Sequence, residues 1–328
     1  MRRWLALRRK ALLAVAAIVV LLLLLTAVRD VARELRYEEV VAAMKATTAA
    51  QIALAALATL LSYFALTGYD WAALRYARAR VGYRIVAPTA FAAYALSNTV
   101  GFGVLTGGAV RMRLYGAVGV DPAAISRAIA FGTVAFGIGT GSVAAVALLF
   151  DAATIAPLVH VPGVLLRAAA CVWLLLLVAL LGACAARRAW PRSTAPGALP
   201  SLGLAGSQLL FSVADIVLAA GALWWLLPPT QVGVLAFVGF FAIATLLGVV
   251  SHAPGGVGVF EAVMLVTLAP AVPAGQLAGA LLLYRAIYFL APLAIALVMF
   301  SAYELRPVAR SPLGRAARGA APLLLAAM

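Results

Sequence analysis

The chain has 328 residues, of which 66% are hydrophobic and only 11% are charged. Its mean hydropathy is +1.09, whereas a soluble domain has about half apolar and about a quarter charged residues. This composition excludes an ordinary soluble enzyme, a disordered chain and a disulfide-rich secreted module. The apolar runs are continuous and do not alternate with polar residues, as the strands of a membrane β-barrel would. We therefore expect an all-α polytopic membrane protein.

The formal net charge of +15 does not indicate a nucleic-acid partner. The basic residues form short clusters between apolar stretches, as in cytoplasmic loops, and no basic face with interleaved aromatic residues is present. Cys171 and Cys184 share one apolar segment, and only two histidines occur. We therefore expect no disulfide, no metal site and no cofactor.

Seven apolar segments are long enough, or nearly so, to cross a bilayer, which takes about 20 residues per helix. They are 11–28, 47–69, 85–102, 122–150, 162–186, 201–227 and 276–304. An eighth apolar region, 232–271, is broken at Pro254-Gly255-Gly256. The first segment is longer than the apolar run of a signal peptide, so we interpret it as a retained span. Residues 29–46 combine apolar positions at near-helical spacing with mixed charges, which predicts an amphipathic interfacial helix.

Clusters of basic residues precede the first span and follow the second, third, fifth and last apolar segments. All of them are cytoplasmic only if 85–118 is a re-entrant hairpin that opens inside and 232–271 is a hairpin that opens outside. The sequence therefore predicts six full spans plus two Gly-rich hairpins, about eight transmembrane segments, with both termini cytoplasmic. Residues 306–328 would be a basic cytoplasmic tail or a truncated continuation. If each hairpin arm crosses fully, the number of crossings rises but the loops keep their sides.

Two halves of the chain, about 47–150 and 201–304, share an order of unusual residues: an acid, a glycine-rich segment and an R-A-I-x-F motif. The members are Asp70, Ser97–Gly103 and Arg127–Phe131 in the first half, and Asp215, Ser251–Gly258 and Arg285–Phe289 in the second. In the predicted topology the equivalent helices run in opposite directions. This pattern predicts an inverted-topology repeat within a single membrane domain, 1–328, an architecture common among secondary transporters.

Asp215 and Arg285 are charged residues well inside apolar segments. A carboxylate at such a depth costs about 2.5–3.5 kcal/mol on insertion scales. Asp215 is therefore a candidate ligand for a cationic group or a proton site. Arg285 is a candidate phosphate ligand, because a guanidinium matches phosphate geometry. The alternative for Asp215 is a structural ion pair with Arg127 or Arg285.

Other charged residues are weaker candidates. Glu261 follows the glycine-rich break and is either a pathway carboxylate or an acid favoured by a helix start. Arg127 lies near a helix end and is a candidate through the repeat alone. Arg111 and Arg113 either hold a phosphate at the inner face or are ordinary cytoplasmic charge. Asp70 is either a gate residue or a partner of Arg75 or Arg111 in a surface pair.

The glycine-rich segments are candidate hairpin turns whose exposed backbone N–H groups could bind phosphate. The residues concerned are Gly101, Gly103, Gly107 and Gly108 in the first segment, and Ser251, Pro254, Gly255, Gly256 and Gly258 in the second.

Four stretches carry a resemblance to a known family: YDWAALRY (69–76), LSNTVGFGVLTGGAVRMRLY (96–115), SHAPGGVGVFEAVML (251–265) and LLLYRAIYFLAPL (281–293). Over roughly residues 10–305 the chain resembles the amino-terminal membrane domain of MprF-type lysylphosphatidylglycerol flippase/synthetases and related stand-alone bacterial inner-membrane proteins. The resemblance implies movement of lysyl- or alanyl-phosphatidylglycerol from the inner to the outer leaflet, which contributes to resistance to cationic antimicrobial peptides. Bifunctional members continue into an aminoacyl-transferase domain that has no counterpart here, so we expect a transporter and not an enzyme.

In such a flippase, Arg285, with Arg127 and the glycine backbone, would hold the phosphate of the phospholipid substrate, while Asp215 and Glu261 would offset an ammonium. Other functions remain open. The chain could carry another phospholipid, a glycolipid or an isoprenoid-linked lipid. It could be a lipid-modifying enzyme that uses Glu261 and His252 as acid and base, or a non-catalytic partner of a separate aminoacyl-lipid synthase. A homodimer also remains open.

Overall fold

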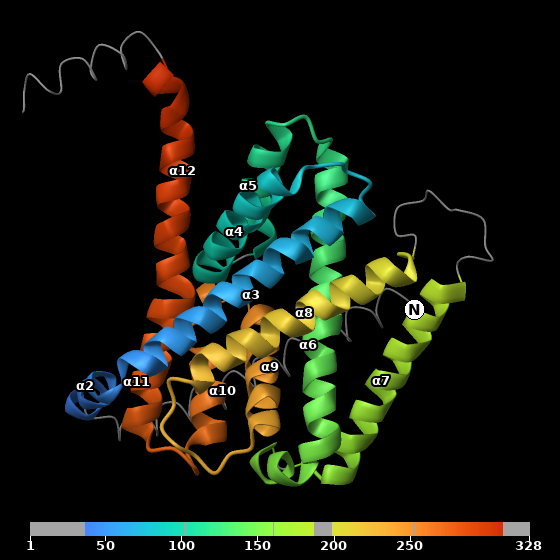
Figure 1. The fold of residues 1–328 in the computed structure, drawn as a ribbon. Helices are drawn as coiled ribbons and strands as arrows, with labels where there is room; N and C mark the ends of the chain where they lie inside the picture. Colours follow the sequence, from blue (N-terminus) through green and yellow to red (C-terminus); the bar gives the residue numbers. More distant parts are fainter. Residues whose placement is uncertain (1–36, 102, 160, 187–198, 252, 311–328) are drawn as a thin grey trace, which may run out of the picture.

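The computed structural model describes residues 37–101, 103–159, 161–186, 199–251 and 253–310, and every regular element in these ranges is helical. The helices are α2 (Tyr37–Ala46), α3 (Ala49–Tyr76), α4 (Tyr83–Val100), α5 (Gly103–Gly116), α6 (Pro122–Val159), α7 (Gly163–Ala186), α8 (Leu202–Trp224), α9 (Val234–Val250), the 3₁₀ turn η2 (Pro254–Gly256), α10 (Val259–Leu268), α11 (Ala274–Tyr284), the π-helical segment η3 (Arg285–Leu290) and α12 (Ala291–Arg310). The prediction of an all-α membrane protein is confirmed (Figure 1).

Within the described ranges, the helices long and apolar enough to cross a membrane number five. They are Ala49–Tyr76, Pro122–Pro157, Gly163–Ala186, Leu202–Trp224 and Ala274–Ser301, and each coincides with a predicted full span. The sixth predicted span, 11–28, lies outside the described residues. The span predicted to end at residue 150 continues to Val159, and its backbone departs from helical geometry at Asp151 (φ −117°, ψ 23°).

The two glycine-rich regions form hairpins of short helices, α4–α5 and α9–α10. At 1.5 Å per residue, the 14 residues of α5 extend about 21 Å and the 10 residues of α10 about 15 Å. A bilayer core is about 30 Å thick. The returning arms are therefore too short to cross alone, which favours re-entrant hairpins.

The tips of the two hairpins pack backbone against backbone. A methyl group on Gly101 would lie 2.7 Å from the Pro254 Cα atom and 2.9 Å from the Gly255 nitrogen. A methyl group on Gly255 would lie 2.8 Å from the Thr99 carbonyl oxygen. Gly101 and Gly255 also have positive φ angles, +79° and +59°, a conformation that costs other residues energy. Only glycine at both positions permits this contact.

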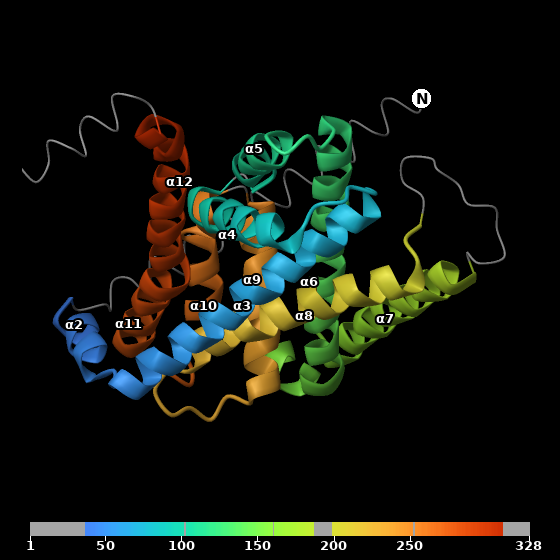
Figure 2. The same cartoon turned by 45° about the horizontal axis from the view of Figure 1, so that its top comes forward.

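Helices α3 and α8 lie side by side and run in opposite directions across the middle of the molecule (Figures 1 and 2). Their close approach depends on Gly68, where a methyl group would lie 2.6 Å from the Phe211 ring. Helix α6 packs against α8 and α9, and α12 packs against α4. Helix α7 packs on α6 at the periphery, where Leu175 and Val178 are exposed, as expected of a lipid-facing span.

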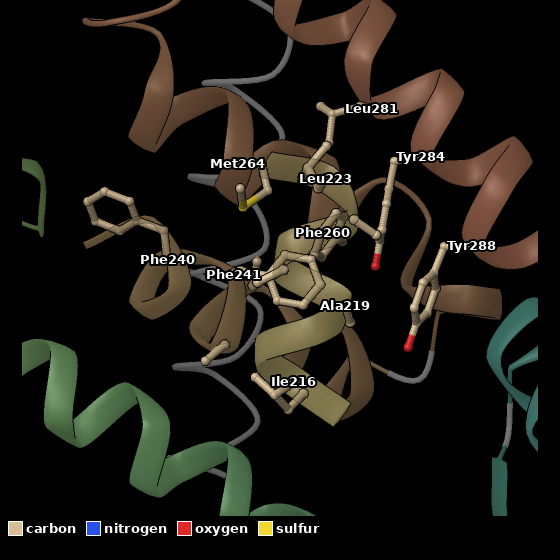
Figure 3. Close-up of a cluster of buried hydrophobic side chains, with 14 of the residues drawn as sticks. Ile216, Ala219, Leu223, Phe240, Phe241, Phe260, Met264, Leu281, Tyr284 and Tyr288 are labelled. Carbon is tan, nitrogen blue, oxygen red and sulfur yellow. The ribbon is translucent and has the colours of Figure 1, made fainter. Parts of the chain in front are cut away.

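A dense aromatic and aliphatic core joins α8, α9, α10 and η3, shown in Figure 3. Phe241 lies edge-on to Phe260, and Tyr284 stacks on Tyr288 at a centroid distance of 5.2 Å. Aromatic pairs of this kind add to the energy of apolar burial. This core fixes the second hairpin and η3 relative to α8.

Helix α2 is the described part of the predicted amphipathic segment 29–46. It packs on α11 across Gly275 and Gly279, where added methyl groups would lie 2.9 Å from the Glu39 Cβ atom and 3.1 Å from the Ala43 Cβ atom. Small residues four apart allow this close helix contact. The chain then enters α3 through Thr48, whose hydroxyl accepts a hydrogen bond from the Gln51 N–H.

The loops predicted to share one side of the membrane lie at the same end of the molecule. Loops 77–82 and 117–121 are at the top of Figure 1 with the end of α12, whereas loops 225–233 and 269–273 are at the bottom with α2. The stretches α3–α6 and α8–α12 each contain a long helix, a broken hairpin and a second long helix. Their equivalence as an internal repeat stays a prediction.

The contact between the hairpin tips predicts that Gly101→Ala and Gly255→Ala destabilise the protein. Each should lose about 1–2 kcal/mol from the positive φ alone, with a further loss from the backbone clash. Apparent melting temperature in detergent checks this. Gly137→Ala in α6, where the added methyl group meets no atom within 4 Å, is the control and should stabilise slightly. Equal melting temperatures for Gly101→Ala and Gly137→Ala would show that the hairpin tips do not pack as closely as the structure shows.

Candidate functional site

A cavity of about 610 Å³ lies at the centre of the helices, and we call it the central cavity. Helices α3 to α6, α8, α9, η2 and η3 contribute to its walls. It brings together four of the predicted charged residues, Asp70, Arg111, Asp215 and Arg285. Three predicted glycines of the hairpin tips, Gly101, Gly255 and Gly256, also line it. The hairpin contact thus forms part of the cavity wall.

Asp215 of α8 is 6% exposed and faces this cavity. Its Oδ1 atom accepts hydrogen bonds from the hydroxyls of Ser62 and Tyr288, the latter at 3.3 Å. The two hydroxyls are themselves 2.8 Å apart. The ion pair of Asp215 with Arg127 or Arg285, which the sequence left open, is therefore not what the structure shows. Neutral hydroxyls from α3 and η3 hold this carboxylate.

Arg285 pairs with Glu261 instead. Its Nε atom donates to the Glu261 Oε1 atom at 2.6 Å, and its Nη1 atom donates to the Gly255 carbonyl at 2.7 Å. The guanidinium lies 4.3 Å from the centroid of the Phe289 ring and 5.5 Å from that of Phe260. These contacts tie the second hairpin to η3.

Glu261 has two structural roles. Its Oε1 atom receives Arg285, and its Oε2 atom accepts the Gly258 N–H at 2.8 Å, at the start of α10. Glu261 is thus an acid at a helix start, where the helix dipole favours it as predicted, and it is also the charge partner of Arg285. Gly258 itself has φ +86°, which explains the glycine at this turn.

Asp70 and Arg111 form a buried pair on the first hairpin's side of the cavity. The Arg111 Nε atom donates to the Asp70 Oδ1 atom at 2.8 Å, and the Tyr115 hydroxyl donates to Oδ2. The Arg111 guanidinium lies 4.5 Å from the centroid of the Tyr94 ring. Arg111 is one of the two partners predicted for Asp70. The prediction that the pair lies at the surface is wrong, because Asp70 is only 5% exposed and Arg111 only 7%.

The remaining predicted residues lie elsewhere. Arg127 is exposed near the start of α6 and lines no part of the central cavity. Arg113 is exposed on α5, 6.0 Å from the centroid of the Phe300 ring. Arg75 stacks on Trp71. His252 lies outside the described residues.

The other hairpin residues shape turns and helix contacts. Gly103 begins α5, and a methyl group on Gly107 would lie 3.0 Å from the Ala93 carbonyl. Gly108 faces Ile129. The Ser251 hydroxyl donates to the Gly248 carbonyl at the end of α9, and Pro254 begins η2.

Comparisons with known proteins identify relatives of this chain. No family model matches it. It is 33% identical over 281 residues to the uncharacterized protein slr0712 of Synechocystis, covering 82% of this chain and 84% of that protein. It is 28% identical over 247 residues to the inner membrane protein YbhN of Escherichia coli, covering 74% of this chain and 77% of YbhN. A segment of 74 residues is 45% identical to the phosphatidylglycerol lysyltransferase of Staphylococcus haemolyticus. The chain belongs to the MprF-like family of membrane proteins.

The similarity to the lysyltransferase covers 22% of this MprF-like chain and only 9% of the longer protein. The relatives therefore connect the chain to membrane proteins and to a lipid-related function. The lysyl transfer named for the staphylococcal protein is a property of that protein.

Several residues of the site were missed from the sequence. Ser62 and Tyr288 bind Asp215 across separations of 153 and 73 residues, and a hydroxyl in an apolar helix gives no specific signal. Its place inside the R-A-I-x-F motif of the second half is the one sequence signal for Tyr288. The structure adds that this motif is π-helical, a geometry frequent at functional sites. Among the described residues, no group of three His, Cys, Asp or Glu side chains could hold a metal ion.

The buried pair predicts a coupled effect of mutation. Asp70→Asn leaves Arg111 buried without its counter-charge, and breaking a buried pair costs about 3–5 kcal/mol. The double variant Asp70→Asn/Arg111→Gln removes both charges and should recover a large part of this loss. Apparent melting temperatures of the two single variants and the double variant measure the coupling.

Arg75→Gln is the control for this experiment, because Arg75 is exposed on the same helix as Asp70. It should leave the melting temperature near that of the wild type. If the loss in the double variant equals the sum of the two single losses, the pair is not coupled and the interpretation fails.

Proposed function

We propose that this MprF-like protein is a phospholipid flippase, which moves aminoacylated phosphatidylglycerol from the inner to the outer leaflet through the central cavity. The observation that carries the proposal is the cavity itself. It brings together Asp70, Asp215 and Arg285, which lie on helices long and apolar enough to cross a membrane, and Arg111 of the shorter helix α5. Charges at such depth are costly, and they typically line substrate pathways.

The proposed roles follow from the contacts of each residue. Arg285 holds the phosphate, since a guanidinium retains donors beyond those bound to Glu261 and Gly255. Asp215 receives the ammonium of the aminoacyl group, because its present partners are neutral hydroxyls and its charge is not paired by them. The Asp70–Arg111 pair, held by Tyr115, fixes the first hairpin in place.

A transporter fits these contacts better than an enzyme. Glu261, the carboxylate considered as an acid or base, is engaged by Arg285 and by the Gly258 N–H. The hairpin tips supply backbone at the cavity wall, where irregular backbone lining a cavity is typical of secondary transporters. Movement of lysyl-phosphatidylglycerol would change surface charge and contribute to resistance to cationic antimicrobial peptides. A homodimer and a separate aminoacyl-lipid synthase are the partners we propose for it.

Transport is tested by head-group sidedness in proteoliposomes. Lysyl-phosphatidylglycerol is loaded and its exposure to a membrane-impermeant amine reagent is followed, beside phosphatidylglycerol with a head-group probe. The wild type should accelerate exposure, and Asp215→Asn and Arg285→Ala should each lose most of it, by about tenfold or more for a lost charge-assisted contact.

Arg84→Ala is the matched control, because Arg84 is exposed at the start of α4. It should transport as the wild type does. If wild-type vesicles and empty liposomes expose the aminoacyl lipid equally, that substrate is wrong. Acceleration of the other probe would then favour another lipid, and no acceleration of either would favour a non-transporting partner of a synthase.

We also propose an orientation in the bacterial cytoplasmic membrane, with both termini cytoplasmic, because this places the clusters of basic residues on the cytoplasmic side. In a background with Cys171→Ala and Cys184→Ala, Gln231→Cys in the 225–233 loop should react with an impermeant maleimide in spheroplasts. Ala117→Cys in the 117–121 loop should react only after permeabilisation. The reverse pattern would overturn the orientation.

A further inference from the structure

A second pocket, of about 740 Å³, lies between α2, α10 and α11, and we call it the α2 pocket. Most of its walls are aliphatic, including Val41, Met44 and Leu265. Three charged residues also line it: Lys45, Glu261 and Arg285. It is therefore an apolar pocket with two cations and one anion.

Arg285 borders both the α2 pocket and the central cavity. Its Nε atom faces Glu261, which lines the α2 pocket, and its Nη1 atom faces the Gly255 carbonyl, which lines the central cavity. Phe260 and Phe289 line the central cavity beside it. The Arg285–Glu261 pair thus stands between the two spaces.

One nitrogen of the Arg285 guanidinium is in an ion pair but makes no hydrogen bond. The Nη2 atom lies 2.6 Å from the Glu261 Oε1 atom, which already receives Nε, and it is buried without a correctly aligned hydrogen bond. A buried donor left in this state costs free energy. An additional oxygen ligand near Nη2 would remove that cost.

We propose that the α2 pocket is a second binding site for the phosphate and chains of a phospholipid, and that Arg285 serves both spaces when its pair with Glu261 opens. The inference rests on the proposed function for its place in transport, but the binding site is testable without it. Lys45 and Arg285 outweigh Glu261 by one positive charge, which complements a phosphodiester. The aliphatic walls suit an acyl chain.

The position of the α2 pocket supports this assignment. Helix α2 lies at the end of the molecule opposite to loops 77–82 and 117–121 (Figure 1). Asp70 and Arg111 of the central cavity lie on α3 and α5 toward those loops. Arg285 lines both spaces, so it forms a wall that the central cavity and the α2 pocket share.

The binding site is tested with a phosphatidylglycerol that carries a diazirine on its head group, photolysed in proteoliposomes, and with mapping of labelled peptides by mass spectrometry. The wild type should be labelled on α2 and α11 as well as at the central cavity. Val41→Trp, which fills the α2 pocket, should reduce labelling of α11 about tenfold and leave labelling of α4 and α8 unchanged. Met44→Trp serves as a second filling variant if Val41→Trp fails to fold.

The neighbouring residue Ala42 is exposed and does not line the pocket, so Ala42→Trp is the matched control and should be labelled as the wild type is.

Glu261→Gln keeps an acceptor for the Gly258 N–H but removes the negative charge that competes with phosphate for Arg285, and it should increase labelling of α11 severalfold. A diacylglycerol with the same diazirine tests the need for phosphate and should label α11 about tenfold less. Excess inorganic phosphate should not compete, because it lacks the chains.

Unchanged labelling of α11 in both filling variants, or equal labelling by diacylglycerol, would overturn the second site. Sidedness measured on the same vesicles separates this result from the proposed function. If the wild type flips lipid and Val41→Trp flips it equally fast, the α2 pocket is off the pathway and the flippase proposal stands. If the wild type flips nothing while the labelling pattern holds, the site stands and the flippase proposal fails.

Discussion

The contact between the two hairpin tips is the constraint on which the rest of the structure depends. Gly101 and Gly255 bring backbone atoms of segments 154 positions apart in the chain against one another, at a distance that no larger residue allows. This contact sets where each returning arm, α5 and α10, can begin. The arms carry Arg111 and Glu261, and through them the partners Asp70 and Arg285 are positioned.

The charges of the site differ in how they are compensated, and this difference organises the function that we propose. Asp70 and Arg111 neutralise each other in a buried pair with Tyr115, so they act as a fixed part of the wall. Asp215 is held only by hydroxyls, and one nitrogen of Arg285 makes an ion pair with Glu261 but no hydrogen bond. A carboxylate without a counter-charge and a guanidinium with a free donor therefore both line the central cavity, an arrangement that suits a head group of mixed charge.

Hydropathy alone predicted the spans, because a helix in lipid must be apolar over a known length. The two hairpins, 85–118 and 232–271, were predicted because only then do all clusters of basic residues lie on the cytoplasmic side. The pairing of Asp70 with Arg111 was also within reach, since few charges lie in apolar segments. The partners of Asp215 were not, because Ser62 and Tyr288 are ordinary residues of apolar helices and only the folded chain brings them together. Arg127, suggested by its motif, is exposed, which shows that a shared motif does not fix a shared environment.

The π-helical segment at 285–290 also determines how one span meets its neighbours. Such a segment holds one residue more than the α-helix it interrupts, so the faces before and after it are offset by about 100°, the rotation per residue in an α-helix. The part before it, α11, binds α2, and the part after it, α12, binds α4. Removal of one residue here would make the span a regular helix, yet it would turn one of these two faces away from its partner, so the local irregularity is what keeps both interfaces aligned.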